Sequence, residues 1–252
     1  MSLTPASATI AVLTPDWPAP AHVRAAFTLR TGGVSAPPFD SLNVGAHVGD
    51  RQEAVAENRQ RIRAQLRLPA EPWWVEQVHG TGVLELPGQT PHATADAVFT
   101  RRAGQVCVVQ VADCLPVLFA ARDGSAVAAT HAGWRGLAAG VLEATVARLA
   151  LHPRELIAWL GPAIGSAHFE VGDEVRAAFV AQERGAAAAF AGNARGRWQC
   201  DLAALARRRL AGLGVPAVLG GSWCTYAARS RFFSYRRDGR CGRMAALIWL
   251  ER

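Results

Sequence analysis

The chain has 252 residues, half of them hydrophobic, and a formal net charge of +7. This length and composition predict one globular domain over residues 1–252, and no segment is long and apolar enough to cross a membrane. All 27 basic residues are arginine, scattered along the chain, which excludes a lysine nucleophile and favours a solvated surface over a nucleic-acid-binding face.

Hydrophobic periodicity and breaker residues predict the following elements. In chain order, we expect strands at 8–13 and 23–29, a helix from Asp50 to Pro69, strands at 75–78, 83–86, 106–112, 117–120 and 126–130, a helix at 136–150, a strand at 156–160, helices at 173–182 and 202–210, and strands at 217–219 and 244–250. Pro116 is expected to disrupt the ladder between two strands. Several links between strands are too short for parallel crossovers. The sequence therefore predicts an α+β fold with mixed β-sheets.

Three short segments each place one metal ligand beside a tight turn. They are QVHG at 77–80 with His79, ADCLP at 112–116 with Cys114, and HAGWRG at 131–136 with His131. Taken singly, Cys114 is better explained as an inert core thiol, and each histidine as a hydrogen-bonded surface residue. Together, two imidazoles and one thiolate form a three-ligand set, which leaves an open position in a catalytic zinc site. The separations of 35 and 17 residues predict a site assembled by tertiary structure.

The segment after His131 also suggests an anion site. Gly133, Arg135 and Gly136 lead into a predicted helix, whose free N–H groups and positive dipole end attract an anion. Phosphate is a suitable ligand, with Arg135 as a forked partner. The alternative is that the glycines only permit the turn and Arg135 pairs with a surface acid.

Seven motifs occur together and in order. They are RTGG (30–33), QVHG (77–80), VADCLP (111–116), HAGWRG (131–136), GPAIG (161–165), FEVG (169–172) and FFSYRR (232–237). With them the chain resembles the laccase-domain family, also called the multicopper polyphenol oxidase family, from about residue 22 to residue 250. Members are associated with purine nucleoside phosphorylase and adenosine deaminase activities. The resemblance implies a layered α/β/β/α domain with zinc on His79, Cys114 and His131.

The chemistry of these reactions suggests roles for other residues, and for Asn43 and Ser234 the resemblance does so. The three metal ligands are expected to act in catalysis. Asp113 is expected to orient a ligand or transfer a proton. An equally weighted alternative is that Asp113 only caps the end of its strand. The remaining candidates for contacts with phosphate, sugar or base are Arg30, Asn43, Arg135, Ser234 and Arg236.

The copper chemistry in the family name is less consistent with this sequence. A trinuclear copper centre needs many histidines, typically in H-x-H pairs, and this chain has seven without such a pair. A blue-copper site usually adds a weak axial methionine, but Met1 and Met244 are far from the motifs in sequence. We therefore expect zinc, with copper as the second choice of metal.

The resemblance, together with the three-ligand set, implies a zinc-dependent purine nucleoside phosphorylase. It would convert adenosine, inosine or methylthioadenosine plus phosphate to the base and ribose 1-phosphate, and would also deaminate adenosine. Three alternatives stay open: a hydrolase that edits a peptidoglycan precursor, a copper polyphenol oxidase, and a metal-free hydrolase with Cys114 as nucleophile and His131 as base. Five cysteines without a C-x-x-C pair predict no disulfide framework and a cytoplasmic location. We expect a small-molecule substrate and a monomer or weak homo-oligomer.

Overall fold

Two β-sheets lie face to face in the computed structural model, which describes residues 9–88 and 93–251. The antiparallel four-stranded sheet has the order β1 (Val12–Leu13), β2 (Val23–Thr28), β13 (Met244–Leu250), β5 (Val106–Val111). The six-stranded sheet has the order β12 (Ala217–Gly220), β8 (Leu156–Leu160), β6 (Leu115–Ala121), β7 (Val127–Ala132), β4 (Ala97–Thr100), β3 (Val83–Glu85). It is mixed, because β12–β8 and β3–β4 are parallel pairs and the other pairs are antiparallel.

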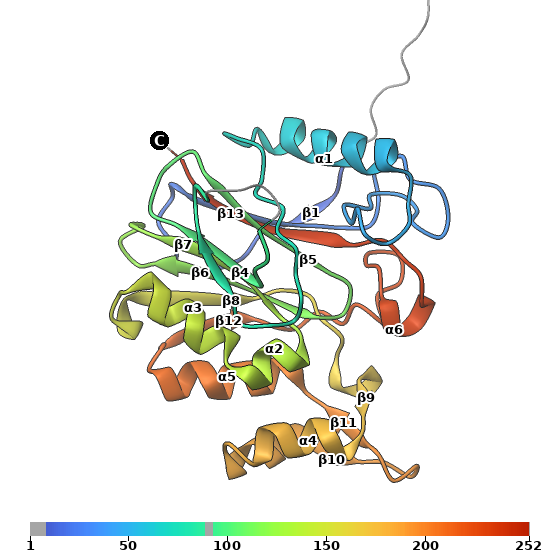
Figure 1. The fold of residues 1–252 in the computed structure, drawn as a ribbon, viewed down its shortest axis with the longest axis vertical. Helices are drawn as coiled ribbons and strands as arrows, with labels where there is room; N and C mark the ends of the chain where they lie inside the picture. Colours follow the sequence, from blue (N-terminus) through green and yellow to red (C-terminus); the bar gives the residue numbers. More distant parts are fainter. Residues whose placement is uncertain (1–8, 89–92, 252) are drawn as a thin grey trace, which may run out of the picture.

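Helices cover the outer face of each sheet (Figure 1). The four-stranded sheet is covered by α1 (Gln52–Leu66), and the six-stranded sheet by α2 (Trp134–Ala139), α3 (Val141–Leu149) and α5 (Leu202–Leu213). Side-chain alternation produces these layers. Along β5, Val108 packs in the apolar cluster under α1, and the next residue, Val109, packs between the sheets. The predicted α+β class and its α/β/β/α layering are confirmed.

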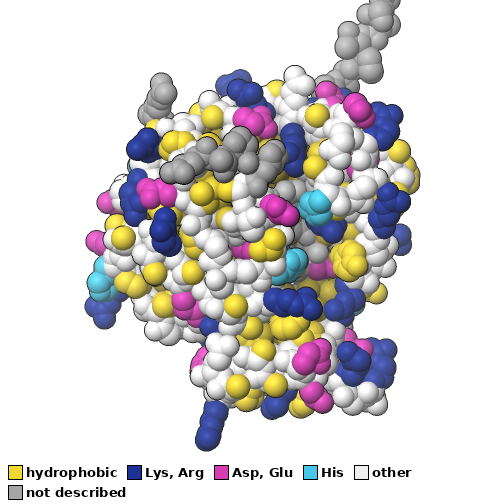
Figure 2. Space-filling view, viewed as in Figure 1, with side chains coloured by type: hydrophobic (Ala, Val, Ile, Leu, Met, Phe, Trp, Pro, Cys, Tyr) yellow, Lys and Arg dark blue, Asp and Glu magenta, His cyan; other side chains and the backbone are white. Residues whose placement is uncertain are grey.

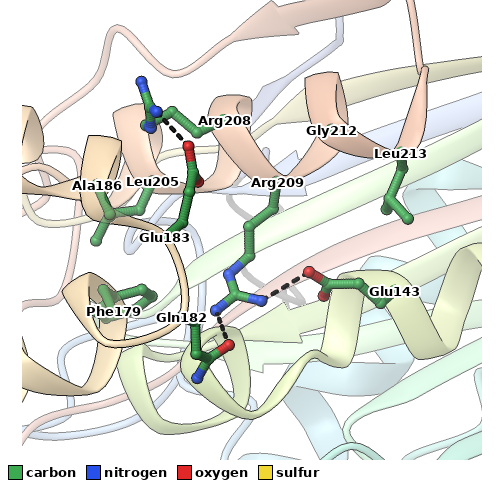
Figure 3. Close-up of a pocket in the computed structure, with 10 residues that line it drawn as sticks. All are labelled: Glu143, Phe179, Gln182, Glu183, Ala186, Leu205, Arg208, Arg209, Gly212 and Leu213. Carbon is green, nitrogen blue, oxygen red and sulfur yellow. Dashed lines mark hydrogen bonds and ion pairs between the residues drawn. The ribbon is translucent and has the colours of Figure 1, made fainter.

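A smaller three-stranded sheet lies at one end of the molecule, beside α4 (Figure 1). Its region comprises β9 (Glu170–Val171), α4 (Asp173–Val180), a 3-10 helix (Arg184–Ala189), β10 (Phe190–Gly192) and β11 (Trp198–Cys200). Figure 3 shows where this region meets the main body: Arg209 of α5 bonds Glu143 of α3 at 2.7 Å and Gln182 at 2.8 Å. The remaining short elements are α6 (Tyr235–Asp238) and 3-10 helices at Pro153–Glu155 and Ser166–His168.

The structure corrects several predicted elements. Segment 75–78 is not a strand and forms only a single bridge from Glu76 to Thr94. The predicted helix at 136–150 is two helices, because Gly140 adopts a left-handed φ of 98° between α2 and α3. Pro116 does not interrupt its strand: it pairs with His131 of β7, and the ladder to β8 begins one residue later.

The ends of other elements also differ from the prediction. The strand predicted at 8–13 is limited to Val12–Leu13, and its first residue lies outside the described part of the chain. Strand β4 and the three-stranded sheet were not predicted. Within residues 9–88 and 93–251, no helix combines the length and apolar composition that a membrane crossing needs. On the face drawn in Figure 2, arginine side chains are spread out with acidic side chains between them.

Candidate metal centre

His79, Cys114 and His131 converge from three separate segments. His79 lies in the turn before β3, Cys114 immediately precedes β6, and His131 lies in β7. One ligand atom from each residue lies within 4.8 Å of the other two. Cys114 Sγ is 3.7 Å from His79 Nε2, and the two imidazole rings meet edge to face with centroids 4.7 Å apart. The predicted ligands therefore form a group that can hold a metal ion.

Unusual backbone conformations bring these side chains together. His79 and Asp113 have φ angles of 61° and 85°, in the left-handed region that residues other than glycine seldom occupy. Gly133 allows the close approach: a Cβ there would lie 2.8 Å from His79 Cδ2 and 3.0 Å from Cys114 Sγ. The backbone of Gly133 does not require glycine, since its φ of −62° suits any residue. Glycine is required there because a side chain would collide with the ligands.

Asp96, which the sequence analysis did not identify, supports two of the three ligands. Its fully buried carboxylate lies 2.8 Å from Nδ1 of His131 and accepts the backbone N–H groups of His79 and Gly80 at 2.9 and 2.7 Å. Since the carboxylate holds the Nδ1 proton of His131, the Nε2 atom is free to face a metal. The only signal in the sequence was an acid directly before the apolar residues of β4, the strand that was not predicted.

The thiol, imidazole and carboxyl groups of this cluster shift one another's pKa values. Burial opposes ionisation of the Cys114 thiol, but His131 and His79 lower its pKa well below the ordinary thiol value. Burial disfavours the charged form of His131, but Cys114 and Asp96 raise its pKa. For Asp96, burial is outweighed by hydrogen bonds from His131, Gly80 and Val78, so the carboxyl pKa is lowered. A thiolate is thus available to a cation near neutral pH.

The three ligands open into a cavity of about 540 Å³. Its other lining residues include His47, Gln77, Gln110, Tyr235 and Arg243. The cavity is thus large enough for a small-molecule ligand and offers amide, imidazole, phenol and guanidinium groups beside the metal group.

Comparison with known proteins identifies the family. Residues 24–251 match the family model described as multi-copper polyphenol oxidoreductase laccase. The chain belongs to this family. Purine nucleoside phosphorylase YfiH of Escherichia coli is 54% identical over 241 residues, covering 95% of this chain and 98% of that protein. A purine nucleoside phosphorylase of Pseudomonas aeruginosa is 55% identical with the same coverage.

Solved structures of similar proteins have the same fold. A Neisseria meningitidis protein matches with a TM-score of 0.91 and 49% identity, over 96% of this chain and 99% of its own. YlmD of Geobacillus stearothermophilus matches with a TM-score of 0.85 and 32% identity, over 92% and 93%. These similarities extend over nearly the whole laccase-family chain.

In this laccase-family chain, Asp113, Ser234 and Arg236 lie together. The Asp113 carboxylate accepts the Ser234 hydroxyl at 3.0 Å, the Arg236 backbone N–H at 2.7 Å and the Thr225 hydroxyl at 2.6 Å. The Arg236 guanidinium donates to the carbonyl of Glu170 at 2.6 Å. Asp113 thus ties the turn that carries Cys114 to the segment that carries α6.

The other candidate residues lie apart from the metal ligands. Asn43 is buried, and its amide bonds the backbone of Gly45 and Arg243 and the carboxylate of Asp50. Arg30 lines a different cavity, of about 690 Å³, and donates to Asp40.

Two further arginines bear on this site, Arg135 four residues after His131 in the sequence and Arg243 in the cavity wall. Arg135 is exposed, stacks on Trp134 at 4.5 Å, and forms no ion pair within the described residues. Its helix α2 has only six residues and therefore a small dipole. Among the described residues that line the 540 Å³ cavity, Arg243 is the only arginine. Sequence reasoning did not select Arg243, because nothing in its neighbourhood distinguishes it from other arginines.

Proposed function

We propose that the protein is a zinc-dependent purine nucleoside phosphorylase that also deaminates adenosine. The observation that supports this most directly is the His79–Cys114–His131 group at a cavity of about 540 Å³. Relatives that align with this chain over nearly its whole length are named purine nucleoside phosphorylase. The proposed substrates are adenosine, inosine and methylthioadenosine, each with inorganic phosphate.

The proposed reactions place defined demands on the site. In phosphorolysis, a phosphate oxygen bonds to C1′ as the bond from C1′ to the purine nitrogen breaks, giving ribose 1-phosphate and the protonated base. In deamination, water adds to C6 and ammonia leaves. The site must therefore hold a phosphate against the sugar and activate a water molecule at a second position.

The donor set favours zinc over copper. One thiolate and two imidazoles suit zinc, and the Asp96 contact preforms one of the imidazoles for binding. A blue-copper site would add an axial methionine, whereas Met244 is buried in β13 and the described cavity lining contains no methionine. When bound, zinc supplies a Lewis acid and lowers the pKa of water.

The residues of the chain have distinct proposed tasks. Asp96 holds the Nδ1 proton of His131, and Asp113 positions the Cys114 turn against Ser234 and the backbone of Arg236. Positive charge for phosphate comes from Arg243 in the cavity wall and from Arg135 beside Gly133. We assign no substrate contact to Arg30, which lines a different cavity, or to Asn43, whose amide is saturated by the chain.

The test is an assay of protein loaded with one equivalent of zinc. With adenosine, we expect adenine to form only when phosphate is present and inosine to form with or without it, both measured by chromatography. Cys114→Ser is expected to lose both activities. Cys224→Ser, a matched change of a partly buried cysteine outside the metal group, is expected to keep them. If the loaded wild-type protein converts none of the three nucleosides, the proposal is wrong.

The contact of Cys114 Sγ with His79 Nε2, at 3.7 Å, also suits a metal-free cysteine hydrolase. The lowered thiol pKa of Cys114 and the raised imidazole pKa of His131 match a thiolate–imidazolium pair. This candidate predicts full activity after exhaustive chelation and a covalent Cys114 intermediate. Loss of activity on chelation and its return with zinc alone would exclude it.

A further inference from the structure

Gln110 is a buried amide beside the metal group with an unmet hydrogen bond. It lies near the end of β5, has 8% of its surface exposed, and lines the same cavity as the metal ligands. Its side-chain Oε1 is buried and has no hydrogen-bond partner among the described residues. Such an atom is costly to stability unless something outside the chain satisfies it.

The backbone around this amide is held firmly. β5 is an edge strand, and the Gln77 side chain takes the place of a neighbouring strand there. Gln77 Nε2 donates to the Gln110 carbonyl at 2.9 Å, and Gln77 Oε1 accepts the Gln110 N–H at 2.7 Å. The backbone groups of Gln110 are therefore satisfied while its side-chain oxygen is not. On the other side, its partner on β13 is Ala245.

Asn43, whose amide oxygen accepts the backbone N–H of Arg243, provides a contrast. Its amide oxygen accepts N–H groups from Gly45 and Arg243, and its nitrogen donates to Gly45 and Asp50. That amide is saturated by the chain and has a structural task. Gln110 has the same chemical group without that saturation, and it is one of the residues that line the cavity of about 540 Å³.

We propose that Gln110 recognises the purine base by hydrogen bonds to the edge that carries the 6-substituent; this rests on the proposed nucleoside chemistry. A side-chain amide presents a donor and an acceptor side by side, which complements that edge of adenine. Rotation of the amide by half a turn exchanges donor and acceptor, so the group also complements the N1–H and O6 of hypoxanthine. One glutamine would thus accept both 6-amino and 6-oxo purines.

The test compares Gln110→Met and Gln110→Glu with Gln60→Met, a matched change of an exposed glutamine on α1. Zinc-loaded proteins are assayed with adenosine, inosine, guanosine and purine riboside, which lacks a 6-substituent. For Gln110→Met we expect kcat/KM to fall about tenfold for adenosine and inosine and less than about threefold for purine riboside. The melting temperature without nucleoside should stay equal or rise, since an unpartnered polar atom is removed.

Gln110→Glu tests the hydrogen-bonding pattern itself. A carboxylate only accepts, and it matches the two adjacent donors of guanine, N1–H and the 2-amino group. We expect the guanosine-to-adenosine ratio of kcat/KM to rise about tenfold. Equal losses on all nucleosides with a lower melting temperature would assign Gln110 a structural role and overturn the proposal.

A separate binding measurement distinguishes failure of this inference from failure of the proposed function. If the wild-type protein catalyses no phosphorolysis or deamination, the proposed function fails. The shift in melting temperature caused by adenosine, compared with that caused by purine riboside, then tests Gln110 alone. A larger shift with adenosine that disappears in Gln110→Met supports base recognition. Equal shifts, or no shift with either nucleoside, overturn it.

Discussion

The carboxylate of Asp96 and the imidazole of His131 form a buried pair, with Oδ1 2.8 Å from Nδ1. The same oxygen accepts the backbone N–H of His79 at 2.9 Å. One acid at the start of β4 therefore orients a ligand on β7 and also fixes the turn that carries a second ligand. Since the two histidines come from distant segments, this link sets their relative position before any metal binds.

Asp96→Asn should weaken metal binding. The amide retains the shape but loses the charge that holds the Nδ1 proton of His131, so we expect zinc affinity to fall about 10- to 100-fold. Competition with a chromophoric chelator measures the affinity. Asp16→Asn, an exposed acid outside the site, is the control and should leave the affinity unchanged. An Asp96→Asn protein that binds zinc as tightly as the wild type would show that the contact does not orient the ligand.

Gly133→Ala should remove metal binding through side-chain crowding. The added Cβ would lie 2.8 Å from His79 Cδ2 and 3.0 Å from Cys114 Sγ, so the ligands must separate. We expect the bound metal, measured by elemental analysis, to fall well below one equivalent. The matched control is Gly212→Ala in α5, where nothing lies within 4 Å of the added Cβ. That change should stabilise the protein by about 0.5–1 kcal/mol. Stoichiometric metal in Gly133→Ala would contradict the crowding argument.

The main layers of the fold follow from local patterns in the sequence. The apolar residues of α1, of α5 and of the buried strands recur with a helical or strand period. Each segment therefore reveals its secondary structure without knowledge of what it packs against. The small sheet does not, because strands such as β9 have two or three residues, too few to show alternation. The break at Gly140 was also missed, since a glycine inside an apolar helical pattern does not show its backbone conformation.

The convergence of His79, Cys114 and His131 could be predicted because each stands in a motif beside residues that force a turn. Asp96 could not be predicted, because its contact with His131 depends on the pairing of β4 with β7, where Ala97 faces Thr130. The arginines show the same limit. Long side chains reach in many directions, and only the tertiary structure places Arg243 at the metal cavity and Arg30 beside Asp40.

Cysteine reactivity should distinguish Cys114 from the buried thiols. His131 and His79 lower the thiol pKa of Cys114, whereas burial raises the pKa of Cys107, Cys200 and Cys241. In metal-free protein at neutral pH, iodoacetamide should therefore modify Cys114 well before those three, as followed by peptide mass spectrometry. One equivalent of zinc should protect Cys114. Modification at the same rate with and without zinc would argue against Cys114 as a metal ligand.

Arg135, which we assign to phosphate, and Arg30, which lines a different cavity, should respond differently to truncation. Arg135 is exposed and forms no ion pair within the described residues, so Arg135→Ala should raise the KM for phosphate about tenfold with little change in melting temperature. Arg30 is largely buried, donates to Asp40 and stacks on Phe233 at 4.7 Å. Its removal leaves those groups without a partner, so Arg30→Ala should lower the free energy of unfolding by about 1–3 kcal/mol. Phosphate kinetics and urea denaturation of both variants test the contrast. A raised phosphate KM in a fully stable Arg30→Ala would instead place that arginine at the substrate.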